Sequence, residues 1–194
     1  MASAIGYYGD RGDEVLDEAS TRGQDFLADI CAAWEAEAMA AEALGMRVVC
    51  VRIGIVLSPR GGALPLMLPA FRMGAGGRLG SGRQWMSWIH LEDIVGILLH
   101  ASGNASLVGP INGTAPNPCT NEAFTRALAS EVHRPALLPV PAAALRVAFG
   151  EMSTILMASQ RVVPRVAERS GYLFRHATLD AALGAALAEV PEAA

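Results

Sequence analysis

Three hydroxyl-bearing side chains lie within the first eight residues of the chain, in the stretch MASAIGYYGDRGDE. Ser3, Tyr7 and Tyr8 stand where an apolar run gives way to a polar, glycine-containing stretch. Serine and tyrosine hydroxyls at the end of one strand can polarise a carbonyl group or relay a proton. We therefore predict that Ser3, Tyr7 and Tyr8 are catalytic. The alternative is that the tyrosines only wall a pocket, since aromatic rings with a wet hydroxyl are common at cleft rims.

The elements that must hold these hydroxyls follow from the hydrophobic periodicity. Residues 1–6 are typical of the end of a strand, and the polar, glycine-rich residues 9–23 predict a loop. Apolar positions recur at three- and four-residue steps over 24–44, which predicts an amphipathic helix capped by Gly45. Residues 47–57, RVVCVRIGIVL, are β-branched and nearly continuously apolar, as in a strand of a buried parallel sheet. A right-handed crossover from the first strand to the second is the economical layout.

Shorter elements follow along the chain. Periodicity and turn signals predict, in order, a short helix, a strand and two helices, at 63–73, 85–90, 90–101 and 120–132. The stretch VGPINGTAP predicts a short strand that ends in a loop. From about residue 141 the composition shifts to helices rich in Ala, Leu and Met, with one strand-like segment, YLF, at 172–174. The final residues, EVPEAA, are expected to fray.

Composition narrows the class of protein. The 194 residues are 52% hydrophobic and 18% charged, so the chain needs a large core or a partner surface. A net charge of -4 with scattered basic residues argues against nucleic acid as a partner. No apolar run is long enough to span a membrane and no signal peptide is visible, so we expect a cytoplasmic protein. The three cysteines are read as reduced thiols, and the four histidines show no ligand pattern, so no metal is predicted.

The glycine-rich stretches lack the context of a dinucleotide-binding turn, which needs GxGxxG between a strand and a helix. SPRGG at 58–62 and RMGAGGRLGSGR at 72–83 are more typical of flexible loops over a cleft. Their arginines either meet a phosphate or carboxylate group or are simply solvated. His90 lies at a predicted strand–helix junction, where a helix-start or core hydrogen-bonding role competes with a catalytic one.

Six stretches, in this order, resemble one family: ASAIGYYGDRGDE, WEAEA, RIGIVLSPRGGAL, GSGRQWMSWIHLEDIV, NGTAPNPCTNEAF and GEMSTILMASQRVVP. They are similar to the epimerase-like extended short-chain dehydrogenases/reductases, the NAD(P)-dependent epimerase/dehydratase family, over nearly the whole chain. The resemblance implies an α/β fold, with the C-terminal half of a Rossmann-like doubly wound parallel sheet at 1–140. It also implies a small, mostly helical domain of unknown function at 141–190, NADP as cofactor, and a small-molecule substrate.

The resemblance also implies roles for individual residues. Ser3 would match the catalytic serine of the family, and Tyr7 or Tyr8 the aromatic residue of its loop. Three residues would bind the cofactor on the strand end nearest the nicotinamide: Arg52, Gly54 and Val56. Three others would line or support the substrate side: Trp85, Trp88 and His90.

Two departures from the family pattern change the expected function. The family's first strand, its glycine-rich turn and helix, and three further strands would all precede Met1. We therefore expect an N-terminally truncated chain that binds NADP weakly by itself and self-associates through an exposed sheet edge.

The second departure concerns the Tyr-x-x-x-Lys pair that related dehydrogenases carry on the helix after the serine loop. The predicted helix at 24–44 has neither residue. If Glu35 matches the glutamate that often follows, Cys31 takes the lysine position and Leu27 the tyrosine position. A neutral thiol and an alkyl group cannot perform that proton transfer. The expected function is a fragment of an NADP-dependent oxidoreductase or nucleotide-sugar-epimerase-like protein. The alternative is a non-catalytic module that binds a small molecule or a protein.

Overall fold

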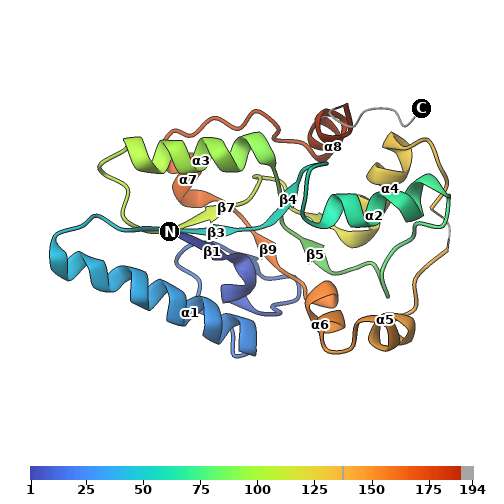
Figure 1. Cartoon of the computed structure of the whole chain (residues 1–194), viewed down its shortest axis with the longest axis horizontal. Helices are drawn as coiled ribbons and strands as arrows, with labels where there is room; N and C mark the ends of the chain where they lie inside the picture. Colours follow the sequence, from blue (N-terminus) through green and yellow to red (C-terminus); the bar gives the residue numbers. More distant parts are fainter. Residues whose placement is uncertain (137, 189–194) are drawn as a thin grey trace.

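A parallel three-stranded sheet forms the centre of the molecule in the computed structural model, which describes residues 1–136 and 138–188 (Figure 1). The strands lie in the order β1 (Ala2–Ala4), β3 (Val49–Ile53) and β7 (Gly109–Gly113), and both pairings are parallel. Helix α1 (Phe26–Met39) connects β1 to β3, so the predicted crossover between parallel strands is confirmed. The α/β class predicted from the sequence is therefore confirmed as well.

Helices cover both faces of this sheet (Figure 1). Helix α1 lies on one face, and α3 (Leu91–Gly103) packs on the other through a core of aliphatic side chains from β3, β7 and α3. The side chains of a strand alternate between the two faces. Val51 and Ile111 contribute to the core beneath α3, which leaves their neighbours along the strands to face α1.

The strand predicted at 47–57 is interrupted at Gly54. Its second part, β4 (Ile55–Leu57), leaves the central sheet and pairs in parallel with β6 (Trp88–His90). The backbone N–H of Gly54 donates to Gly113 O, whereas that of Ile55 donates to Ser87 O, so the strand changes partner between these two residues. The strand predicted at 85–90 divides in the same way, because β5 (Trp85–Met86) pairs antiparallel with β8 (Cys119–Thr120).

The N-terminal segment is shorter in strand and richer in turns than predicted. After β1 the chain forms a 3-10 helix, η1 (Ile5–Tyr8), in place of the last residues of the predicted strand. The following loop contains β2 (Val15–Leu16), which pairs in parallel with β9 (Arg161–Val162). Helix α1 continues into the 3-10 helix η2 (Ala40–Leu44), which Gly45 ends in the left-handed conformation, as predicted.

The remaining helices are α2 (Ala63–Arg72), α4 (Asn121–Glu131), α5 (Ala142–Phe149), α6 (Met152–Met157), α7 (Arg165–Arg169) and α8 (Leu179–Ala188). Ala167 of α7 belongs to the core beneath α3. Helices α2, α4 and α8 build a second core beside the sheet. Helices α2, α4 and α8 pack around the fully buried Trp88. No helix of the described residues has the length and apolar character needed to cross a membrane.

The strand predicted at 172–174 is wrong, because that stretch is irregular. Its tyrosine is fixed by a side-chain contact: the Tyr172 hydroxyl donates to Asp93 in the first turn of α3. A bond of this kind to another element is invisible to local propensity. The predicted fraying of EVPEAA falls on residues outside those described.

Candidate functional site

A row of three polar side chains crosses the central sheet on the face that α1 covers. Ser3 of β1 is in register with Arg52 of β3, and Arg52 is in register with Asn112 of β7. Residues in register on neighbouring strands point to the same side of a sheet. All three are buried, so each polar group needs a partner inside the protein.

Glu35 of α1 and Tyr8 of η1 complete a buried network with this row. The Arg52 guanidinium donates two hydrogen bonds to Glu35, at 2.7 and 2.9 Å, and Ser3 Oγ donates to Glu35 Oε1 at 2.7 Å. Arg52 Nη1 also donates to Tyr8 Oη at 3.0 Å, and Tyr8 Oη donates to Asn112 Oδ1 at 2.7 Å. Paired, charge-assisted bonds of this kind fix the orientation of both partners. The network therefore fastens α1 and η1 to all three strands.

The charges of the network explain its protonation. Burial lowers the pKa of Arg52, but its bonds to Glu35 and Tyr8 outweigh burial and leave the pKa raised, so the guanidinium stays charged. Burial raises the pKa of Tyr8 to about 12, although Arg52 favours the phenolate. Tyr8 therefore keeps its proton at neutral pH and shares it with Asn112.

The three predicted catalytic residues thus lie together but in different environments. The hydroxyls of Ser3 and Tyr8 are buried and already donate to protein partners. The Tyr7 ring is partly exposed, and it stacks on Arg52 with the guanidinium carbon 3.4 Å from the ring centroid. Catalysis by Ser3, Tyr7 or Tyr8 stays a prediction, and Tyr7 is the one of the three best placed to touch a ligand.

The raised pKa of Tyr8 predicts a loss of stability in alkali. A tyrosine in an unfolded chain has a pKa of about 10. Because the folded value is higher, the folded state holds this proton more tightly. The contribution of this proton to the free energy of unfolding is complete below about pH 10. It is lost as the pH rises towards about 12, and the loss amounts to about 2 kcal/mol.

Urea unfolding at several pH values between about 9 and 12 measures this effect. The Tyr8→Phe variant should lose stability less steeply over that range, since it has no proton at this position. An equally steep decline in Tyr8→Phe would show that Tyr8 is not the group responsible.

Leu27 and Cys31 face the turn that follows β1. A Cβ atom added to Gly6 would lie 3.5 Å from Leu27 Cβ and 3.7 Å from Cys31 Sγ. The two side chains therefore occupy the side of α1 next to the Ser3 strand, where the family resemblance places tyrosine and lysine. Burial raises the pKa of the Cys31 thiol, which keeps it neutral. All 15 basic residues of the chain are arginines, so no lysine elsewhere in the sequence can replace it.

The predicted cofactor-binding residues each have a structural role. Arg52 is held by Glu35 and Tyr8. Gly54 lies where two backbones meet, since an added Cβ would stand 2.5 Å from Ser87 O. Val56 is half-buried in β4, in register with Ile89. Binding of NADP by Arg52, Gly54 or Val56 stays a prediction.

The predicted substrate-side residues are spread over three environments. The Trp85 indole N–H donates to Asp13 at 2.8 Å, and Arg161 stacks on its ring at 4.2 Å. Trp88 is fully buried in the core between α2, α4 and α8. His90 is the N-cap of α3, and its Nδ1 accepts the backbone N–H of Glu92 at 3.2 Å. The helix-start interpretation of His90 is thus confirmed, while substrate contact by the three residues stays a prediction.

Sequence reasoning did not identify Asn112 or Asp13 as members of these clusters. Asn112 follows the apolar Ile111 on a short strand, and nothing local distinguishes it from an ordinary turn asparagine. Asp13 lies in a loop 72 residues before Trp85. The register of β7 brings Asn112 into place. The pairing of β2 with β9 and the bonds of Ser159 to Gly12 and Trp85 bring Asp13 into place.

Parallel strands joined through helices on both faces, with polar residues gathered where the strands end, define this chain as a Rossmann-like α/β protein. A family model described as NAD dependent epimerase/dehydratase family matches residues 6–111, and a domain of unknown function, DUF1731, matches residues 140–186. The chain belongs to the NAD dependent epimerase/dehydratase family.

Relatives and solved structures agree with this assignment. An epimerase family protein of Mycobacterium bovis is 49% identical over 184 residues, which cover 94% of this chain and 61% of the relative. The crystal structure of human epimerase family protein SDR39U1 with NADPH has a TM-score of 0.88 at 34% identity and covers 97% of this chain and 64% of that one. A nucleoside-diphosphate sugar epimerase from Corynebacterium glutamicum has a TM-score of 0.77 at 37% identity, covering 95% of this chain and 37% of that one. The chain therefore spans about three fifths of the length of the curated relatives, at 61% of the first.

The residues that the structure describes do not by themselves form a complete dinucleotide site. Such a site needs a glycine-rich turn that leads from a sheet strand into a helix N-terminus, where the pyrophosphate binds. Among the described residues, β1 runs into η1, whose residues are held by the buried network, and β3 continues through Gly54 into β4. The cationic Arg52 is enclosed and paired with Glu35. These features do not fit a phosphate cradle.

Proposed function

We propose that this chain supplies the substrate-facing part of an NADP-dependent oxidoreductase or nucleotide-sugar-epimerase-like protein. Tight cofactor binding would then require a phosphate-binding turn from outside these 194 residues. The observation that carries the proposal is the position of β1. It is an edge strand of the parallel sheet, and the row of polar side chains begins on it at Ser3. Membership of the family, together with the crystallisation of human SDR39U1 with NADPH, supports NADP as the cofactor.

Titration with NADPH tests this proposal. The chain alone is expected to bind NADPH weakly, with no saturation at low micromolar concentration in calorimetry. A chimera that adds to this chain the part of the mycobacterial relative that the chain does not cover is expected to bind NADPH at least about tenfold more tightly, because we expect that part to supply a helix N-terminus for the phosphates.

The matched control is the same chimera with the glycines of its added turn replaced by valine, which should bind no better than the chain alone. Low micromolar affinity of the unextended chain would overturn the proposal. Equal binding by the chimera and its valine control would overturn it too.

A non-catalytic binding module is the second candidate, and the surface of α1 favours it. Phe26 and Trp34 of this helix are 77% and 58% exposed, and Leu44 just after it is 79% exposed. Exposed aromatic and aliphatic side chains of this size are typical of surfaces that bind a partner or a second copy of the chain. Light scattering of the purified chain distinguishes the two kinds of partner, because only binding to a second copy raises the measured mass. Measurable hydride transfer by the chimera, together with a failure to self-associate and a pull-down that recovers no partner, would exclude the binding module.

A further inference from the structure

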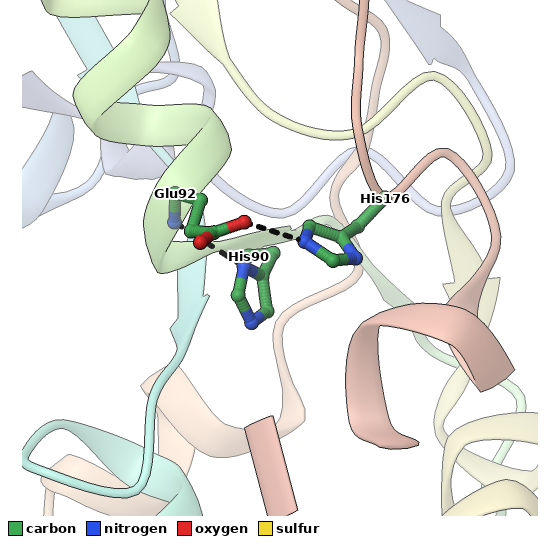
Figure 2. A group of neighbouring side chains, drawn as sticks. All are labelled: His90, Glu92 and His176. Carbon is green, nitrogen blue, oxygen red and sulfur yellow. Dashed lines mark hydrogen bonds and ion pairs between the residues drawn. The ribbon is translucent and has the colours of Figure 1, made fainter. Parts of the chain in front are cut away.

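Two histidines and a glutamate meet at the start of α3 (Figure 2). His90 ends β6, Glu92 lies in the first turn of α3, and His176 belongs to the segment between α7 and α8. One ligand atom of each residue lies within 4.8 Å of the other two. His176 Nε2 is 2.9 Å from Glu92 Oε2, and the two imidazole rings are 4.0 Å apart between centroids.

The position of His176 does not depend on its own ring. The buried carboxylate of Asp93 accepts the backbone N–H groups of Arg175 and His176, at 2.8 and 2.9 Å. It also accepts the hydroxyl of Tyr172 at 3.0 Å. These bonds fasten the segment to α3, so the His176 ring is held beside Glu92 by backbone contacts. Ligands held by a surrounding shell in this way bind an ion at a lower cost in conformational entropy.

The three side chains form a recognisable ligand set for a transition metal. Two imidazoles and one carboxylate are the protein ligands of open zinc sites, in which water occupies the remaining position. Mg²⁺ and Ca²⁺ prefer oxygen ligands alone, so this set selects against them. We propose that His90, Glu92 and His176 bind a divalent transition-metal ion, with Zn²⁺ as the best match to the ligand set.

Exposure and charge are compatible with binding of an ion from solvent. The Glu92 side chain is 48% exposed and that of His176 is 17% exposed, which gives the ion a route to the buried His90. The N-terminus of α3 carries partial positive charge, which opposes a cation. The carboxylate of Glu92 has to offset this charge, which makes it as necessary as the histidines.

Two existing contacts would compete with the ion. The His90 Nδ1 accepts the backbone N–H of Glu92, and coordination through that nitrogen would replace this cap. Arg175 Nη1 lies 3.8 Å from Glu92 Oε2, but the side chain of Arg175 is 71% exposed and can turn into solvent. The ion would join the β6–α3 junction to the segment before α8. Binding should therefore stabilise the folded state, by an amount that rises with the logarithm of the free metal concentration once this exceeds the Kd.

Calorimetric titration of the full chain with Zn²⁺ tests the proposal, beside the melting temperature with and without Zn²⁺. We expect saturable binding of one ion per chain and a rise in melting temperature. His176→Gln should weaken binding by at least about tenfold, since outer-shell changes alone cost that much, and should make the rise in melting temperature smaller. His176→Gln leaves the backbone bonds to Asp93 in place, so the variant should fold.

His133→Gln is the matched control, because this histidine is exposed at the end of α4 and distant in sequence from the cluster. It should bind Zn²⁺ as the unaltered chain does. Glu92→Gln should resemble His176→Gln. The proposal is overturned if the unaltered chain shows no saturable binding, or if His176→Gln binds Zn²⁺ as tightly as His133→Gln. Neither result depends on NADP binding, so the outcome is independent of the proposed function.

Discussion

Replacement of Arg52 by alanine is expected to destabilise the chain by about 3–5 kcal/mol, the usual effect of breaking a buried ion pair. The side chains of Arg52 and Glu35 are only 4% and 11% exposed. Without the guanidinium, the Glu35 carboxylate keeps a single hydrogen bond, from Ser3, and Tyr8 loses its donor. A buried charge left without its partner costs far more than the pair contributes. Urea unfolding followed by circular dichroism measures the change.

Two further variants show whether burial is the reason. Arg165 forms an exposed ion pair with Glu168, and the two side chains are 50% and 36% exposed. Arg165→Ala breaks this pair and should lower the free energy of unfolding by less than about 1 kcal/mol. The double variant Arg52→Met with Glu35→Leu removes both charges and should recover a large part of the lost stability. The network would not have the role assigned to it if Arg52→Ala were as mild as Arg165→Ala.

The second large effect is expected at Gly54, where the chain passes from the central sheet to β4. A methyl group at Gly54 would stand 2.5 Å from Ser87 O and 2.9 Å from Thr114 Cγ2. Backbone oxygen cannot turn aside as a flexible side chain can, so β6 or β4 must move. Gly54→Ala should destabilise the chain by about 1–3 kcal/mol or more, as overpacking of a well-packed interior does.

Thermal melts of Gly54→Ala and Gly103→Ala provide the comparison. Gly103 ends α3, and an added Cβ there meets nothing within 4 Å. Alanine is also the better helix former, so Gly103→Ala should be neutral or slightly stabilising. Equal melting temperatures for the two variants would show that β4 and β6 can separate without cost.

These two expectations bear on the function as well as on the fold. Arg52 and Gly54 were predicted to bind cofactor, and the structure gives both a reason to be present without any ligand. In the chimera with the added turn, an Arg52→Lys change, which keeps the charge but not the fork of donors, separates the roles. If the role of Arg52 is purely structural, Arg52→Lys should lower the free energy of unfolding, because lysine cannot reproduce the paired bonds to Glu35. It should then change the affinity for NADPH much less.

The sequence by itself determined the features that depend on neighbouring residues. The apolar run at 47–57 and the three- and four-residue period over 24–44, followed by Gly45, predicted parallel strands joined by a helix. The structure confirms the helix, its end at Gly45 and the parallel pairing of β1 with β3. It divides the apolar run at Gly54, and it leaves Phe26 and Trp34 of the predicted apolar helix face exposed. Motif order also predicted the family that the comparisons confirm. These features succeed because periodicity and capping act within one or two turns of chain.

The tertiary structure alone decided which distant residues share a site. The break at Gly54 depends on Ser87, the buried network depends on the register of Ser3, Arg52 and Asn112, and neither leaves a local pattern. The histidines showed no ligand spacing because His176 lies 84 residues from Glu92, and only the bonds of Asp93 bring it there. Spacing along a chain reports which side chains share a helix or strand face, whereas strand register and loop docking determine which faces meet.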